Sequence, residues 1–135
     1  MTSWQTVWRD GLTPHLSTPG LRALEQALLT DDPRLLQGAT TSPPLLACVA
    51  DWPAEGACLI GFCGWQGEGL MTVGEVGDYF DRLCCACDAS MGEPAGVRWL
   101  LNRWDESPRA EMLPLLLAEV QRTLAQRQRR EAGAA

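Results

Sequence analysis

A short polar residue followed by proline recurs along the chain, and each such pair marks a position where a helix or turn can begin. Proline suits the first helical position, because its missing N–H would have no partner there, and the polar residue before it can cap the helix. The pairs at 18–19 and 42–43 predict helices that run to Asp31 and Asp51. The pair at 32–33 predicts a turn that ends at Gly38. We therefore expect short helices joined by tight turns.

The best-supported helix begins after Thr72-Val-Gly-Glu75, which has the spacing of a capping box. In this motif the threonine hydroxyl accepts from the backbone N–H of the glutamate, and the glutamate side chain reaches back to the threonine backbone. A helix is predicted over residues 73–91. Its apolar stripe consists of Val76, Phe80, Leu83, Cys84, Cys87 and Met91. Another face carries Asp78, Asp81, Cys85 and Asp88.

Two further helices are predicted beyond residue 92. Glu93-Pro94 begins one, with Val97, Leu100, Leu101 and Trp104 at helical spacing. Residues 105–108 end it and begin the last helix, whose stripe is Leu113, Leu117, Val120 and Leu124. Pro114 lies inside that helix, so we expect a kink there or a start closer to residue 112. The apolar run 57–63 fits a helix or a minor strand, and the helix is favoured.

These elements predict an all-α fold, a compact single domain over residues 1–135 with about five or six short helices in an irregular or orthogonal bundle. The 135 residues are 46% apolar, which suffices for a core without disulfides or metal. Trp4 and Trp8 are spaced for one helical face, so we expect the N-terminal segment 1–17 to dock through them. Residues 131–135 have nothing to bury and are expected to fray.

Charge and hydropathy exclude several classes of partner. The net charge is −6, and only the end of the chain, with Arg122, Arg127, Arg129 and Arg130, is basic. We therefore expect no nucleic-acid partner. Neither a signal peptide nor an apolar segment long enough for a membrane span is present, so we expect a soluble cytoplasmic protein without a membrane partner. Cysteines in a reducing compartment are expected to be free thiols or metal ligands.

Five of the six cysteines fall within residues 58–87. Four of them, Cys58, Cys63, Cys84 and Cys87, are candidate zinc ligands, because thiolates at CxxC spacing can share one ion. The favoured alternative is that Cys84 and Cys87 pack as small apolar side chains. A redox role is disfavoured, because the CxxC lies well inside a helix beside Asp78 and Asp81. Apart from zinc, no cofactor is expected.

The glycine-rich stretch 64–69 is interpreted as a tight loop with several positive φ angles. It lacks the GxxxxGK[ST] pattern of a phosphate-binding loop, and Glu68 would repel phosphates. Trp65, together with Glu68, is the candidate contact for a partner protein. The acids Asp78, Asp81 and Asp88 could bind a hard cation, but a solvated helix face is the ordinary explanation.

The leading functional hypothesis is a small all-α module for protein–protein interaction or self-association. It is based on six tryptophans and a leucine-rich final helix. A thiolate metal-binding protein is the second hypothesis. An enzyme that pairs His15 with a cysteine is the third, and it is disfavoured because the chain assembles no recognisable catalytic set.

Overall fold

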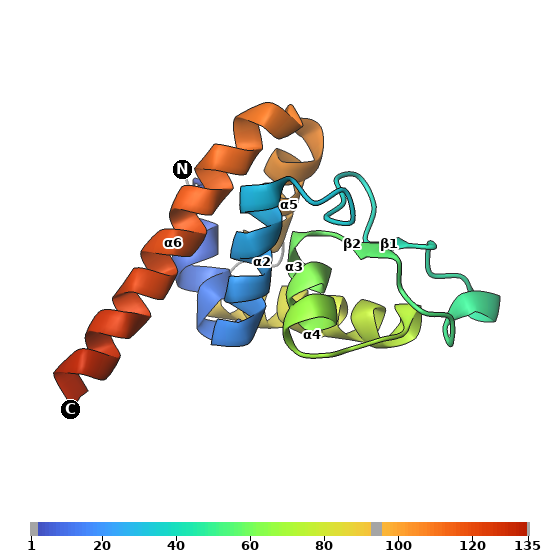
Figure 1. Ribbon diagram of the computed structural model, residues 1–135, viewed down its shortest axis with the longest axis horizontal. Coiled ribbons are helices and arrows are strands. Elements are labelled where there is room, and N and C mark those ends of the chain that lie inside the picture. Colours follow the sequence, from blue (N-terminus) through green and yellow to red (C-terminus); the bar gives the residue numbers. More distant parts are fainter. Residues whose placement is uncertain (1–2, 93–95, 135) are drawn as a thin grey trace.

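Four long helices and a series of short ones make up the chain in the computed structural model, which describes residues 3–92 and 96–134 (Figure 1). The long helices are α2 (Thr18–Thr30), α4 (Val73–Met91), α5 (Gly96–Glu106) and α6 (Arg109–Ala134). The short ones are α1 (Trp4–Thr6), η1 (Val7–Leu12), η2 (Thr13–His15), η3 (Ala47–Val49), α3 (Leu59–Phe62) and η4 (Cys63–Gly67). Two-residue strands β1 (Thr41–Ser42) and β2 (Gly56–Ala57) form the one sheet of the described residues. The all-α prediction is confirmed.

Helix α4 has the bounds that its capping box predicts. The Thr72 hydroxyl accepts from the Glu75 backbone N–H at 3.1 Å, and Glu75 Oε1 accepts from the Thr72 backbone N–H at 3.1 Å. Gly92, with φ of 70°, ends the helix. The predicted stripe faces inward: Val76, Leu83 and Cys87 are buried, and Phe80, Cys84 and Met91 are partly buried. The acidic face is exposed at Asp78, Asp81 and Cys85 and half-buried at Asp88.

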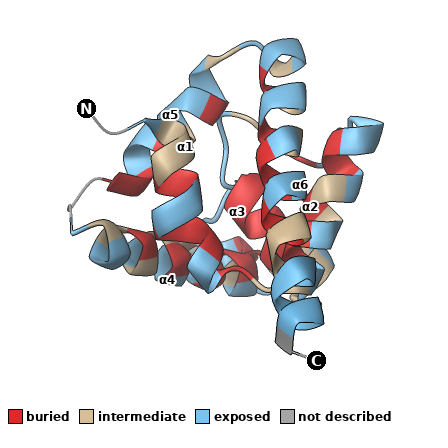
Figure 2. Ribbon diagram, turned by 90° about the vertical axis from the view of Figure 1, so that its left-hand side faces the viewer, coloured by how far each residue is buried: buried red, intermediate tan, exposed pale blue. Residues whose placement is uncertain are grey.

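The N-terminal segment is part of the core. Helix η1 packs against α4 and α5, and its Trp8 and Leu12 are completely buried, while Trp4 in α1 is half-buried. Trp104 of α5 and Met112 of α6 are also fully buried. Figure 2 shows buried positions on the inward faces of the helices. The N-terminal segment is therefore held by the burial of Trp8 and Leu12 where η1 meets α4 and α5.

Helix α6 differs from its predicted form in three ways. It begins at Arg109, so the start near residue 112 is wrong, and Pro114 lies inside it. Figure 1 shows α6 as one unbroken helix. Met112 and Leu116 are fully buried, whereas Leu113 and Leu117 are only partly buried. The early half of the predicted stripe is thus displaced by one residue, while Val120 and Leu124 are buried as expected. The helix continues to Ala134, although Glu131, Ala132 and Gly133 are exposed.

The helix predicted over 42–51 is wrong. Thr41 pairs with Ala57 and Ser42 with Gly56 in an antiparallel ribbon, and the Ser42 carbonyl accepts from the Glu55 backbone N–H at 2.7 Å. The Ser42–Pro43 peptide is cis. Only η3 remains helical in this segment. Residues 57–63, predicted as a helix or a minor strand, contain both. Ala57 belongs to strand β2, and Cys58 then caps helix α3.

The glycine-rich stretch is mostly helix rather than a loop. Helix η4 covers Cys63–Gly67, and only Gly69, with φ of 81°, needs the left-handed conformation there. Gly67 instead serves close packing, because a Cβ at this position would lie 2.3 Å from Gly20 Cα in α2. Its missing side chain lets the two backbones touch. The predicted start at Glu93-Pro94 lies outside the described residues, and α5 is helical from Gly96.

Candidate functional site

The four candidate zinc ligands lie in or beside the core. Cys58 Sγ accepts from the Gly61 backbone N–H at 3.4 Å and so caps α3, while Cys63 Sγ donates to the Leu59 carbonyl at 3.4 Å. On α4, Cys87 is fully buried and Cys84 partly buried. A Cβ added at Gly11 of η1 would lie 2.8 Å from Cys87 Sγ, so this thiol packs tightly against the N-terminal segment.

Burial makes these thiols hard to ionise. It raises the pKa of Cys58 and of Cys87 to about 11 and that of Cys84 to about 12. The pKa of Cys63 is also raised, first by burial and then by the nearby Cys58 and Glu68. Zinc and electrophiles react with the thiolate, which is scarce at neutral pH when the pKa is this high. Among the described residues, no three His, Cys, Asp or Glu side chains form a group that could hold a metal ion, so the arrangement offers the zinc hypothesis no support.

His15 bonds to a serine. Its Nε2 lies 2.7 Å from Ser90 Oγ at the surface, where α4 ends. This bond ties η2 to α4. It offers no support for a cysteine–histidine catalytic pair.

Trp65, the predicted partner contact, packs on its own chain. It is half-buried, its ring meets that of Phe62 edge-on at 5.7 Å between centroids, and the Arg34 guanidinium lies 5.3 Å from its centre. Glu68 is exposed and lies within 3.4 Å of the Ser17 hydroxyl, which donates to it. The Trp65 ring thus contacts Phe62 and Arg34 of its own chain, and contact with a partner through Trp65 and Glu68 stays a prediction.

A different surface gathers exposed apolar side chains. Leu45 is 51% exposed, Leu46 62%, Trp52 56% and Met71 70%. Leu45 and Leu46 precede η3, and Trp52 follows it. Met71 lies alongside, because the Ala54 backbone N–H donates to the Met71 carbonyl and the Val73 backbone N–H to the Trp52 carbonyl, each at 2.9 Å. We call these four residues the apolar tip, and Figure 1 shows the segment between β1 and β2 projecting from the end of the molecule.

Beside the apolar tip lies an open groove of about 550 Å³. One wall is formed by residues 38–41, and the other is α4 at Gly77, Phe80 and Asp81. Leu45 belongs to both the tip and the groove, and it lies so close to α4 that a Cβ at Gly77 would be 3.0 Å from its Cδ2. The absence of a side chain at Gly77 therefore lets Leu45 lie against α4.

The surroundings of the tip are acidic. Residues 35–81 contain the acids Asp51, Glu55, Glu68, Glu75, Asp78 and Asp81 and no arginine or lysine. Five of these six acids flank the tip in sequence or lie on the first turns of α4, and all five are exposed. An apolar surface framed by carboxylates attracts cationic, partly apolar ligands and repels nucleic acid.

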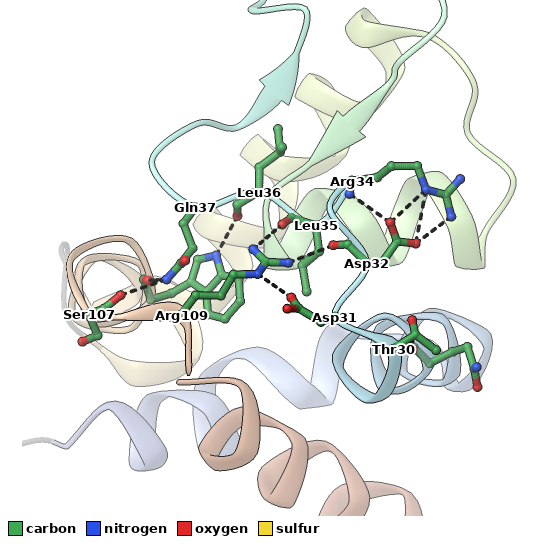
Figure 3. Close-up of polar contacts among 11 residues, drawn as sticks. Thr30, Asp31, Asp32, Arg34, Leu35, Leu36, Gln37, Ser107 and Arg109 are labelled. Atoms are coloured by element: carbon green, nitrogen blue, oxygen red, sulfur yellow. Dashed lines mark hydrogen bonds and ion pairs between the residues drawn. The ribbon is translucent and has the colours of Figure 1, made fainter. Parts of the chain in front are cut away.

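A network of hydrogen bonds centred on Arg109, which we call the polar node, holds the segment that leads into the groove wall at residues 38–41 (Figure 3). Arg109 at the start of α6 donates to the Leu35 carbonyl at 2.7 Å, to the Asp32 carbonyl at 2.8 Å and to Asp31 at 2.7 Å. The Trp104 indole N–H donates to the Leu36 carbonyl at 2.7 Å. These bonds hold the chain at residues 31–36, directly before the groove wall begins.

The node continues to the groove itself. Gln37 donates to the carbonyls of Trp104 and Ser107 at 2.6 and 3.0 Å, and the Gly38 backbone N–H donates to Asp105 at 2.8 Å. The Cys58 backbone N–H donates to the Thr40 carbonyl at 3.0 Å. The wall is therefore anchored at both ends before any ligand arrives.

Sequence reasoning missed the tip and the groove. The helix predicted over 42–51 would include Leu45 and Leu46, and nothing in their spacing indicates exposure. The one available signal was the run of acids without arginine across residues 35–81.

No helix in the described part of the chain has the length and apolar character needed to cross a membrane. Comparison of the chain with protein-family models, curated proteins and solved structures found no match.

Proposed function

We propose that this protein is a protein-interaction module that binds a basic, amphipathic segment of a partner through the apolar tip and the adjoining groove. The observation that carries the proposal is a cluster of four of the seven large apolar side chains that are exposed among the described residues: Leu45, Leu46 and Trp52 on the projecting segment, and Met71 beside it. The other three, Leu29, Trp99 and Leu115, are spread over α2, α5 and α6. Single exposed apolar residues are ordinary, whereas a patch of them marks an interaction site.

The chemistry of the surface favours a basic partner. Exposed acids surround the tip, and the thiols and the histidine offer no support for catalysis or metal binding. A tryptophan and a methionine suit such a role, because a rigid indole supplies contact area and a flexible thioether adapts to the partner. Leu45 and Phe80 give the groove an apolar floor on which a side chain of the partner can rest.

The proposed place of action is a reducing compartment such as the cytoplasm. Support comes from the cysteines, all six of which are free thiols. Two of them, Cys48 and Cys85, are exposed, and an oxidising compartment would tend to cross-link them.

The test is a selection from a displayed peptide library in which charge and hydrophobicity vary independently. We expect the enriched peptides to combine arginine or lysine with large apolar residues, and their binding to weaken with added salt. Enrichment of acidic peptides, or of none, would contradict the proposal. Self-association is measured in parallel by sedimentation of the full chain. A dimer that the Trp52→Ser variant abolishes would identify a second copy as the occupant instead.

A further inference from the structure

A second cavity, far smaller than the groove, has the opposite electrostatic character. It has a volume of about 140 Å³ and lies between η1, η2 and α6. Its lining includes three arginines, two hydroxyls and one amide: Arg9, Arg127, Arg130, Thr13, Thr123 and Gln126. Among the residues that the structure describes, no aspartate or glutamate lines it. Such a pocket is unexpected in a chain of net charge −6.

The guanidinium of Arg127 is held in place by neutral acceptors. Its Nη2 donates to the carbonyls of Thr13 and Leu16, each at 2.8 Å, and its Nη1 donates to the Thr18 hydroxyl at 3.0 Å. A guanidinium has five N–H groups. These three bonds therefore fix its orientation and leave two N–H groups for another acceptor. None of the three acceptors carries a charge that balances that of Arg127.

The three arginines of this pocket differ in whether a carboxylate pairs with them. Arg9 donates from Nε and Nη2 to the two carboxylate oxygens of Glu119 at 2.8 and 2.7 Å, so its charge has a partner within the chain. Arg127 and Arg130 form no ion pair with any described residue, and they are close enough that the charge of Arg130, after burial, lowers the pKa of Arg127. Two like charges thus line the same cavity, and neither forms an ion pair with a carboxylate of the described residues.

We propose that this pocket binds a phosphate group, with Arg127 and Arg130 as its cationic ligands. A phosphate monoester or inorganic phosphate carries about 1.5 to 2 negative charges at neutral pH, whereas a carboxylate carries one, so phosphate balances the two guanidiniums better. Guanidinium groups bind phosphate oxygens through paired N–H donors. The amide of Gln126 adds a further donor from the same helix.

The volume of the pocket limits the size of the group that it can bind. A volume of 140 Å³ equals the liquid volume of roughly five water molecules, and pockets for whole small molecules begin at about 300 Å³. The pocket therefore takes the phosphate group alone, and the rest of any larger ligand stays outside. Free phosphate and the headgroup of a phosphorylated lipid share this chemistry.

The experiment is a calorimetric titration of the full chain with inorganic phosphate at constant ionic strength, in the wild type and in two variants. Arg130→Gln removes a proposed ligand, and we expect about tenfold weaker binding. Arg129→Gln is the matched control, because it removes the same charge from the next residue, which does not line the pocket. We expect it to weaken binding less than about twofold, since screening limits the effect of a charge outside the site.

A parallel arm uses phosphatidylcholine vesicles with and without a phosphatidylinositol monophosphate. Vesicle binding that needs the phosphorylated lipid and is lost in Arg130→Gln identifies a headgroup as the source. Saturable binding of free phosphate alone identifies a soluble ligand. The proposal is overturned if neither probe binds saturably, or if Arg129→Gln weakens binding as much as Arg130→Gln. Unchanged circular dichroism and melting of both variants excludes misfolding as the cause.

Discussion

At the scale of single residues, the cysteines differ in how far water reaches their thiols. Cys58, Cys63 and Cys87 are buried, and Cys48 and Cys85 are exposed. Because alkylation needs an accessible thiolate, we expect iodoacetamide at neutral pH to modify Cys48 and Cys85 first. Peptide mass spectrometry of the native protein over time measures this order. Modification of Cys87 as fast as Cys85 would show that the α4–η1 contact is open in solution.

The raised pKa values of these thiols also predict a loss of stability in alkali. An unfolded cysteine has a pKa near 8.5. Above that pH the unfolded chain releases protons that the folded chain keeps, so the free energy of unfolding falls as the pH rises. The stabilisation is complete below the unfolded pKa and is lost progressively toward the folded values of about 11 for Cys58 and Cys87.

Urea unfolding at a series of pH values from about 8 to 10.5 tests this linkage. We expect Cys63→Ala to reduce the slope, because the pKa of this buried thiol is raised. Cys85→Ala, at an exposed position of α4, serves as the control and should leave the slope unchanged. Equal slopes in the two variants would contradict the account of the buried thiols.

At the scale of elements, the capping box determines where α4 begins. Thr72→Ala removes the hydroxyl that accepts from the Glu75 backbone N–H, and loss of such a cap costs about 1 kcal/mol. Thr30→Ala is the matched control, since its exposed hydroxyl at the end of α2 bonds only to the Gln26 carbonyl. We expect this control to cost less than about 0.5 kcal/mol in urea unfolding. Similar losses in both variants would show that the cap contributes no specific stability.

The contact between α2 and η4 depends on two glycines. A Cβ at Gly67 would lie 2.3 Å from Gly20 Cα, so Gly67→Ala must separate two backbones and should cost about 3 kcal/mol or prevent folding. Gly133→Ala, at an exposed helical position with open space around it, should change stability by less than about 0.5 kcal/mol. Thermal unfolding of both variants measures the difference. A Gly67→Ala protein as stable as the wild type would contradict this packing.

Elements with local signals could be predicted from the sequence. Helix α4 has a capping box and a continuous apolar stripe within nineteen residues, and α2 has a proline start and leucines at helical spacing. The segment 40–58 could not be predicted, because its backbone hydrogen bonds join residues far apart in the sequence, such as Glu55 to Ser42 and Cys58 to Thr40. Periodicity and capping describe only contacts between residues three or four apart.

At the scale of the whole molecule, two surfaces of opposite charge lie on different elements. The apolar tip and its acids belong to the segment 45–81, and the arginine pocket to η1, η2 and α6. Neither could be predicted as a site, since both depend on which residues the fold leaves exposed. The sequence indicated only the broad division between an acidic middle and a basic end.

The polar node around Arg109 connects α6 with the groove. The Arg109 guanidinium joins the start of α6 to residues 31–35, which lead into the groove wall. Arg109→Met keeps the length of the stem and removes all three bonds. We expect it to lower stability by about 2 kcal/mol and to speed amide hydrogen exchange at Thr40 and Thr41 more than in α4. Unchanged exchange at these two residues would show that the groove wall is held without the node.

The central claim is that the apolar tip is the partner-binding surface, and a matched pair of tryptophan variants tests it most directly. Trp52 is 56% exposed on the tip, and Trp99 is 55% exposed on α5. With a selected basic peptide as ligand, calorimetry should show roughly thirtyfold weaker binding for Trp52→Ser, as for a buried aromatic anchor. Trp99→Ser should bind like the wild type. Equal binding by Trp52→Ser and the wild type, or an equal loss in Trp99→Ser, would contradict the claim.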